Sequence, residues 1–464
     1  MTALVDPVTR PLGHLADGGL AHAASGPSWL AKDRRDAARW VEAHGFPTRK
    51  DEDWRYLPLG PVLTEHVAVG DMDAAPAAGG DWAREALDAC SLGLGGNRLV
   101  FVNGRFAADL SRLDTGPHGA RVSSIGPALA GEAPHARPWA WRRSSEPRHA
   151  FDALNVALAT DGALVEIPDG VVLDEVIELV YFTDPGGRAL LVSPRSLLFF
   201  GKESKATIVE TYAGAAGSRY CTNAVTEVVL GPGADVEHYR LQAESERAFH
   251  FSSLDVRQAS ASHLGSHLVA LGSEIARHEV QVLLDGEGAA LELDALYLPR
   301  GAQHHDHPVL VDHVAPSCTS RQRYVGIVDD HAHGVFNGHV VVRPGAAGTD
   351  ASQSNKNLLL SDHAEVDTRP RLEIFTDDVV CAHGAAIGRL DADALFYLRS
   401  RGIPGTLARG LLVQGFATQA LEQLALAPFR ARAEALLAGR LALDDGASPS
   451  PMPDGEPIRR GHGR

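Results

Sequence analysis

The feature that most constrains this chain is a long series of short β-branched runs separated by turns at regular intervals. From about residue 163 to about residue 380 the runs include VVLDEVIELVYF, ATIVETY, AVTEVVL, HEVQVLLD and HVVVRPG. Turn clusters at Gly231–Asp235, Asp285–Gly288 and Pro344–Ala346 recur about 55 to 60 residues apart, which suits two coils of a solenoid. A mainly β fold of the β-helix type is favoured. A β-sandwich or double-stranded barrel, which also uses evenly spaced short strands, stays open as the alternative.

Helical patterns flank this β-rich region. From about Ser28 to about Leu92 the texture is helical, and the segment WLAKDRRDAARWVEAHGF places apolar side chains on one face. These side chains are Trp29, Leu30, Ala37, Ala38 and Val41. The texture changes at LVFVNGRF, where Asn103-Gly104 predicts a hairpin turn. We therefore expect a helical N-terminal region over residues 1–95 and a β-helix core over residues 96–388.

The segment after the core predicts two helices. Asp391 can cap a helix that contains Phe396 and Tyr397 and ends at Gly402. Beyond Pro404, apolar residues recur at four-residue intervals, which places Leu412, Phe416, Ala420 and Leu424 on one face. That face either packs on its own domain or receives a partner. We expect a C-terminal helical region over residues 389–446 and a disordered, Pro-rich tail over residues 447–464.

Composition excludes several classes of protein. The formal charge of −16 argues against a general nucleic-acid binder, because phosphate binding relies on an excess of Lys and Arg. The first residues lack a basic region followed by an apolar run, and no later stretch approaches the roughly 20 apolar residues of a spanning helix. We expect a cytoplasmic protein that does not enter a membrane. Its four cysteines are too scattered for a disulfide framework and are expected to be reduced thiols.

Motifs for hydrolytic chemistry are missing from the sequence. The one Gly-Lys pair, Gly201-Lys202, is followed by Glu203, which would repel phosphate, and no Gly-x-Ser-x-Gly elbow occurs. The acid pairs Asp329-Asp330 and Asp377-Asp378 would suit a polysaccharide-cleaving β-helix enzyme. Neighbouring acids in a strand point to opposite faces, however, so one of each pair is expected to face solvent.

Histidines are dense enough to raise the question of a metal site. Two clusters stand out, with further histidines between and after them: Gln303-His304-His305-Asp306-His307, His313, His331-Ala332-His333 and His339. His331 and His333 would converge on one face if they lie in a strand. Turn and surface histidines in a chain with 22 of them need no such purpose. A cupin-like oxygenase requires a Glu at the position that Phe336-Asn337-Gly338 occupies. The missing Glu weakens the hypothesis that the chain is a small-molecule metalloenzyme.

A Cys-x-His pair at Cys381 and His383 is the strongest chemical signal. In an extended segment both side chains face the same side, which brings a thiol and an imidazole within reach of one iron or one cluster edge. Two ligands do not complete a site. The others must come from elsewhere in the chain or from another subunit, while a buried structural cysteine is the alternative.

At these residues the sequence resembles a known family. The run from Gly286 to Ile403 is similar to the SufB/SufD family of iron–sulfur cluster scaffold proteins, and within it to the SufD branch. The matching segments are DGEGAALELDALYL, DHVAPSCTSRQRYVGI, GVFNGHVVV, SQSNKNLLLSDHAEVDTRPRLEIFTDDVVCAHGAAIG and LFYLRSRGI, with RKDEDWRYLPL and LVFVNGRF upstream. The resemblance covers most of the chain. Four cysteines are few for a SufB-like member, which would supply more of the cluster thiolates.

The resemblance implies a right-handed parallel β-helix between helical ends and a scaffold without enzymatic activity of its own. Such a chain would pair with SufB through the end of the β-helix and bind the ATPase SufC through its C-terminal helices. An isolated chain could also form a homodimer through the exposed sheet end. No intrinsic cofactor is implied. A nascent iron–sulfur cluster or iron would be shared with SufB, and reduced flavin would belong to the complex.

The resemblance also assigns residues. His383 is expected to face a SufB thiolate at the heterodimer interface, with Cys381 as a nearby second candidate. The SufC-binding surface would comprise Asp391, Phe396, Tyr397, Arg399, Arg401 and Gly402. Arg399 and Arg401 have a second explanation, since cations in a last helical turn favour the helix dipole. The chain departs from the family where Ala382 replaces a frequent Ser, which removes a hydroxyl but neither candidate ligand.

Overall fold

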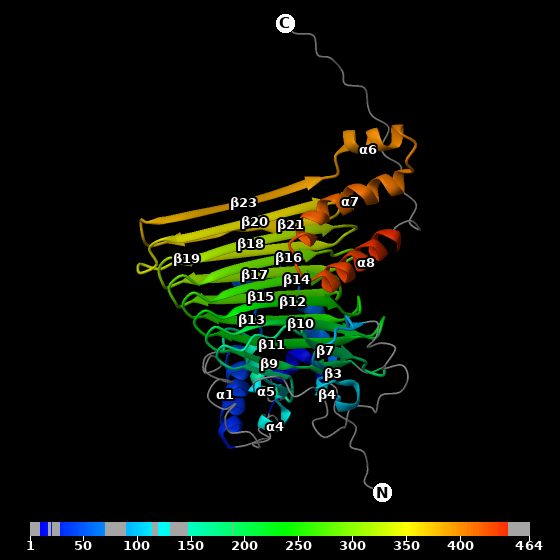
Figure 1. Ribbon diagram of the computed structural model, residues 1–464. Helices are drawn as coiled ribbons and strands as arrows, with labels where there is room; N and C mark the ends of the chain where they lie inside the picture. Colours follow the sequence, from blue (N-terminus) through cyan, green and yellow to red (C-terminus); the bar gives the residue numbers. More distant parts are fainter. Residues whose placement is uncertain are drawn as a thin grey trace.

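The computed structural model describes residues 10–16, 20, 28–69, 90–113, 119–129, 147–187 and 189–443. Its centre is a stack of long, nearly parallel strands that form two facing sheets (Figure 1). From β10 onward the chain alternates between the sheets, so strands pair with the next but one in sequence. Lys205 pairs with Asp235 and Asp235 pairs with His263, which gives coils of about 30 residues. The predicted parallel β-helix is confirmed, and the sandwich and barrel alternatives are wrong.

One sheet carries the N-terminal helices and is called here the N-side sheet. It contains β1 (Arg10–Pro11), β2 (His66–Val69), β5 (Arg121–Ser124), β6 (Ala163–Ile167), β8 (Leu190–Val192), β9 (Arg195–Phe200), β11 (Tyr220–Leu230), β13 (Phe249–Gln258), β15 (Ile275–Leu284), β17 (His304–His313), β19 (His333–Val342), β21 (Glu365–Thr368) and β22 (Arg371–Ile374). The opposite sheet, called the C-side sheet, contains β3 (Arg98–Val102), β4 (Arg105–Phe106), β7 (Ile177–Thr183), β10 (Lys205–Gly214), β12 (Asp235–Ala243), β14 (His263–Ala270), β16 (Ala290–Tyr297), β18 (Thr319–Val328), β20 (Thr349–Leu359) and β23 (Val379–Arg389).

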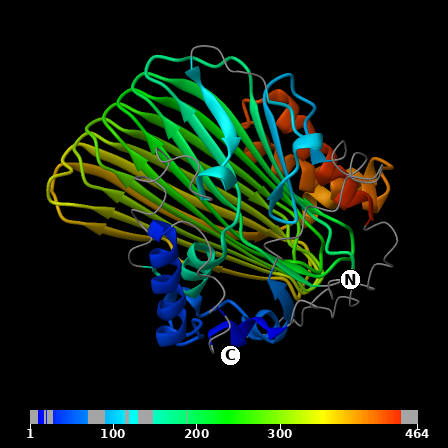
Figure 2. The same cartoon turned by 90° about the horizontal axis from the view of Figure 1, so that it is seen from below.

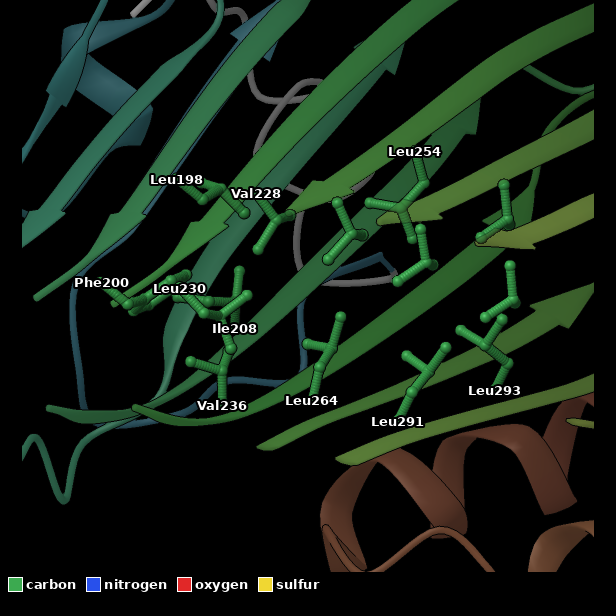
Figure 3. Packing of buried hydrophobic residues seen from close by; sticks show 14 of the residues in the cluster. Leu198, Phe200, Ile208, Val228, Leu230, Val236, Leu254, Leu264, Leu291 and Leu293 are labelled. Carbon is green, nitrogen blue, oxygen red and sulfur yellow. The ribbon is translucent and has the colours of Figure 1, made fainter. Parts of the chain in front are cut away.

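The space between the sheets is filled by inward-facing side chains. Alternate residues of each strand point inward, and these include Leu198, Val228 and Leu254 from the N-side sheet and Ile208 and Leu264 from the C-side sheet. Figure 3 shows the two sets meeting in the interior. Burial of β-branched and leucine side chains against both sheets explains why the runs seen in the sequence are so apolar.

Helices cover the outer faces of the two sheets on different sides of the solenoid (Figure 2). Against the N-side sheet pack the N-terminal elements η1 (Leu12–Ala16), α1 (Ser28–His44), η3 (Glu52–Trp54), α2 (Gly60–Thr64) and α5 (Ala150–Leu158). Two short elements, η4 (Ala108–Leu110) and α4 (Gly126–Leu129), also precede the long strands. The helix α5 lies within residues 96–388 yet packs on α1, so the N-terminal helical layer returns after the first strands.

The predicted N-terminal helix and hairpin are confirmed, but β1 and β2, within the region predicted as helical, join the N-side sheet. The side chain of Trp29 lies outside the described part of the chain. In α1 the side chains of Leu30, Ala37, Ala38 and Val41 are buried on one face. Asn103 and Gly104 both have positive φ, at 52° and 78°, and join β3 to β4 in an antiparallel hairpin. A residue other than Gly, Asn or Asp would be strained at either position.

The C-terminal helices α6 (Ala392–Ser400), α7 (Gly405–Leu421) and α8 (Ala427–Leu443) follow β23, and α7 and α8 pack on the outer face of the C-side sheet. The predicted face of the helix after Pro404 is one residue out of place. The buried positions of α7 are Ala408, Val413, Ala417 and Leu421, whereas the predicted Leu412, Phe416 and Ala420 are half-buried beside them. Leu424 is buried as predicted, just past the end of the helix. A four-residue repeat marks two adjacent stripes of a helix, and the residues alone do not say which stripe meets the sheet. The tail over residues 447–464 lies outside the described residues.

Candidate functional site at the open end of the solenoid

The solenoid ends at β23, whose one neighbour in the C-side sheet is β20. Its register pairs Ala351 with Cys381 and Gln353 with His383. Within the part of the chain that the structure describes, the opposite edge of β23 pairs with no strand. An eleven-residue strand edge with free backbone donors and acceptors is a template for another strand. The end of the solenoid is therefore built to be extended.

Cys381 and His383 lie on the inward face of this last strand. Val379 and Cys381 pack against the interior apolar cluster, while Val380, on the other face, is 69% exposed. Strand alternation places His383 on the same face as Cys381. His383 is exposed because no further coil covers it. Its imidazole forms no hydrogen bond and no ion pair with any residue that the structure describes.

The two side chains make an incomplete metal site. Burial raises the pKa of the Cys381 thiol above its ordinary value of 9.0. A backbone hydrogen bond at Ala351 opposes this rise in part, and the Asp350 carboxylate adds a smaller amount to it. The thiol is therefore protonated at neutral pH, and metal binding would displace that proton. Among the described residues, no three His, Cys, Asp or Glu side chains come together as a metal site. Further ligands would have to come from another molecule.

The rim of the open end is unusually apolar for an exposed surface. Four large side chains near β22 and β23 are exposed by 41 to 69% of their area: Ile374, Phe375, Val380 and Ile387. The neighbouring helix α6 adds Phe396 at 73% and Tyr397 at 57%. Contiguous exposed apolar side chains mark interaction surfaces, whereas scattered ones are ordinary. These exposed apolar side chains are distributed along the last strands of the solenoid and α6, next to the free edge of β23.

Helix α6 has no fully buried residue and is capped at both ends. The Asp391 carboxylate accepts hydrogen bonds from the backbone N–H groups of Asp393 and Ala394, at 2.9 and 3.2 Å. At the other end Gly402 has φ of +84°, and its N–H and that of Ile403 bond to carbonyls in the last turn. The predicted cap and stop are confirmed. Ala394, Leu395 and Leu398 are half-buried and the helix contacts α7, so it is the remaining surface of α6 that is open to a partner.

Of the two arginines predicted at this helix, Arg401 contacts an aromatic ring. Its guanidinium lies 5.1 Å from the centre of the Tyr397 ring, a cation–π contact at an exposed site. Arg399 lies in the last turn of α6, where a cation favours the helix dipole. The structure thus brings these two arginines, Phe396 and Tyr397 together on one exposed helix.

The histidine clusters have a different location from the one that the sequence suggested. His305, His307 and His313 of β17 are fully buried, so the reading as turn and surface residues is wrong for them. His307 lies between the rings of Tyr297 and His278, with ring centres 4.4 and 5.4 Å away. Burial lowers its pKa to about 3, because the interior disfavours the imidazolium. These imidazoles are neutral packing groups inside the solenoid.

The second cluster does not form a strand pair. His331 lies in an exposed turn before β19, so it does not share a strand face with His333. His333 instead bonds the Asp367 carboxylate at 2.8 Å. Of the acid pairs, Asp329 forms an ion pair with Arg409 of α7 at 3.0 Å and thus has a structural role. Asp377 and Asp378 are exposed in the turn before β23.

The signature around Trp54 joins the N-terminal region to the solenoid. The Trp54 ring stacks on Phe151 of α5, at 5.6 Å, and the guanidinium of Arg277 lies 3.9 Å from its centre. Beside it is a cleft of about 630 Å³ between α1 and the outer face of the N-side sheet. Arg277 is held there by Glu279 and Asp306. The sequence motif therefore marks an anchor between layers, and the cleft was not foreseen because its walls come from distant segments.

A charged network on the outer face of the C-side sheet was also missed. The ring of His267 bridges the carboxylates of Asp294 and Glu237, at 3.0 and 3.1 Å, and Arg323 bonds Asp294 from the next strand. Burial acts to lower the pKa of His267, but these two carboxylates outweigh it and raise the pKa to about 9. Register between coils creates this network, and spacing along the sequence does not reveal it.

Comparison with known proteins identifies the family. Residues 182–416 match the model of the SUF system FeS cluster assembly SufBD core domain, and residues 21–179 match that of the SufBD protein N-terminal region. The chain belongs to the SufBD family. Among its relatives, an iron–sulfur cluster assembly SufBD family protein of Synechocystis is 32% identical, with 87% of this chain and 90% of the relative covered. The family resemblance predicted from the sequence is confirmed.

Relatives called SufD are similar over much of the SufBD fold. The iron–sulfur cluster assembly protein SufD of Escherichia coli is 31% identical, with 82% of this chain and 86% of the relative covered. SufD of Bacillus subtilis is 28% identical, with 60% and 63% covered. This member of the SufBD family is thus an iron–sulfur cluster assembly protein. None of the helices that the structure describes is both long enough and apolar enough to cross a membrane.

Proposed function

We propose that this chain is the SufD-type, non-enzymatic scaffold subunit of a SufBCD complex, and that it supports iron acquisition and de novo cluster assembly where it meets SufB. The observation that carries the proposal is the open end, where an unpaired strand edge, exposed apolar side chains and a Cys-x-His pair with an exposed histidine occur together. A SufB end strand that pairs with β23 would cover the rim and bring its own side chains toward His383. Cytoplasmic location remains part of the proposal.

The chemistry of this interface would depend on ligands from both subunits. His383 would offer a ring nitrogen to iron or to a nascent cluster, while SufB would supply thiolates. Cys381 is the weaker candidate, because its thiol is partly buried and its pKa is raised. The cluster is cargo that leaves the complex, so an incomplete site on each subunit suits a scaffold better than a closed cage. Reduced flavin, if it takes part, would belong to the complex.

SufC would bind the C-terminal helices. Helix α6 exposes Phe396 and Tyr397 and is fixed by its caps, and α7 exposes Leu407 and Leu411 at 56% and 44%. The opposite side of α7 is packed on the C-side sheet. ATP-driven dimerisation of two SufC subunits would therefore act on helices that are attached to the same sheet as β23. A change at the SufB contact follows if nucleotide favours one of two arrangements.

Co-purification tests the proposal. The tagged chain is expressed anaerobically with its SufB and SufC candidates, and the composition of the complex and the visible absorbance of bound iron–sulfur are recorded. We expect a complex that assembles a cluster, and His383→Ala should abolish the absorbance while leaving the complex intact. The matched control is His331→Ala, in an exposed turn. A chain that stays alone and colourless, or a His383→Ala variant that still assembles cluster, would contradict the proposal.

A further inference from the structure

Three polar side chains stand in register at the end of the solenoid. Gln322 of β18 pairs with Gln353 of β20, and Gln353 pairs with His383 of β23. All three lie on the inward faces of their strands, about 4.8 Å apart from one strand to the next. The column begins in the closed interior, where Gln322 and Gln353 are 1% and 3% exposed, and ends at the exposed His383.

The side-chain amide of Gln353 makes a hydrogen bond through its nitrogen, whereas its oxygen makes none with the described residues. Its Nε2 donates to Oε1 of Gln322 at 3.2 Å, on the side away from β23. Its Oε1 is buried and has no hydrogen-bond partner among the described residues. Nε2 of Gln322 is likewise buried without a partner, so each amide uses one polar group in this contact, and Oε1 of Gln353 is left over. A buried carbonyl without a donor is costly, so this oxygen requires a partner.

The amide nitrogen also has close neighbours. Gly338 of β19 faces it from the opposite sheet, and a Cβ built at Gly338 would lie 2.9 Å from Nε2 of Gln353 and 2.6 Å from the Phe336 ring. The space beside the amide is therefore filled. Asn355, the next inward residue of β20, is already used, because its amide nitrogen bonds Tyr297 and its oxygen accepts from Asn357.

We propose that Gln353 is a positioning residue for His383: the bond is not made in the conformation described, but rotation of the exposed His383 side chain lets Oε1 of Gln353 accept a hydrogen bond from one ring N–H, which leaves the other ring nitrogen unprotonated and directed to the partner side. This inference rests on the proposed role of His383 as a ligand. The second ring nitrogen of a metal-binding histidine usually donates to a carbonyl or carboxylate, which fixes the tautomer and the orientation of the ring. Gln353 is the inward register neighbour of His383 with an acceptor to spare.

The tautomer of His383 in the full chain, without metal, is the first readout. Ring ¹⁵N chemical shifts are recorded on histidine-labelled protein, and the His383 signals are assigned by their loss in His383→Gln. We expect one neutral tautomer in the parent chain and a mixture in Gln353→Met, which keeps the shape of the side chain but lacks the acceptor. Gln353→Glu, which keeps an acceptor, should restore the single tautomer. Ser354→Ala, on the outward face of the same strand, is the control.

Iron binding by the complex with the SufB and SufC candidates is the second readout. Gln353→Met should weaken the binding of ferrous iron by about 10 to 100-fold, and Gln353→Glu should recover most of it. If Gln353→Met does not fold, as judged by its thermal transition, Gln353→Asn withdraws the carbonyl by one methylene and takes its place. A tautomer and an iron affinity that do not change in a folded variant would overturn the inference.

The two proposals fail in different ways. If His383→Ala assembles clusters normally, the ligand role fails, whatever the tautomer experiment gives. If His383→Ala abolishes assembly but Gln353→Met keeps one tautomer and full iron affinity, the positioning role of Gln353 alone is wrong.

Discussion

The buried imidazole of His307 predicts a specific loss of stability in mild acid. In the unfolded chain this side chain takes up a proton near pH 6.5, whereas in the folded chain burial keeps it neutral down to about pH 3. Because the folded pKa is lowered, this contribution to stability is complete above pH 6.5 and is lost as the pH falls toward 3.

The magnitude follows from the interval between the two pKa values. Each pH unit below 6.5 costs about 1.4 kcal/mol for one proton that only the unfolded state binds, so His307 accounts for about 2 kcal/mol between pH 7.5 and pH 5.0. Carboxylates with lowered pKa, such as Glu210 at about 2, protonate in the unfolded chain below about pH 4.5 and leave this window to histidine. His307→Leu should therefore reduce the acid loss of stability by about 2 kcal/mol.

Urea unfolding at pH 7.5 and pH 5.0 measures the effect as a difference within each variant. The cost of replacing the ring itself cancels in that difference, which matters because His307 touches Tyr297 and His278. His331→Leu, in an exposed turn, is the matched control and should behave as the parent. If His307→Leu loses as much stability in acid as the parent, the imidazole is either not neutral or not buried in the folded chain.

Three further outcomes are expected. His267, whose pKa is raised to about 9 by the two carboxylates it bridges, stabilises fully below pH 6.5 and loses that contribution as the pH rises through 9; thermal melting of His267→Gln should therefore match the parent more closely at pH 10 than at pH 7. Gly338→Ala should cost about 1 to 3 kcal/mol in urea unfolding, because its Cβ would meet the Phe336 ring, whereas Gly388→Ala, with nothing within 4 Å, should be tolerated. Asp391→Ala should cost the helix that it caps about 1 kcal/mol, seen as faster amide hydrogen exchange in its first turn; unchanged exchange would contradict the capping role.

The sequence predictions were most accurate for features that depend on a few neighbouring residues. Turn residues at two-coil intervals and apolar β-branched runs predicted the solenoid, because every coil repeats the same packing problem. The Asn103-Gly104 hairpin, the Asp391 cap and the Gly402 stop each depend on a single residue type with one strong conformational preference. For the same reason the sequence alone places the Cys381 and His383 pair on one strand face.

Relations between coils are what the sequence did not show. In the sequence, His307 is one more histidine in a polar cluster. The strand register of the structure places it between Tyr297 and His278. Gln353 is unremarkable in sequence, yet it is the neighbour of His383 across the strand pair. Such contacts join residues about 30 positions apart, and no local propensity specifies which of several registers forms.

The stacking of coils also gives the molecule a built-in measure of length. Each coil of about 30 residues adds one strand spacing, about 4.8 Å, to the distance between the Trp54 anchor and β23. Insertion or deletion of a whole coil would move the terminal Cys-x-His pair by that step and leave the packing within every remaining coil unchanged. A change in the number of coils would therefore move His383 relative to the N-terminal layer in fixed increments. A partner that contacts both regions would fit one number of coils and no other.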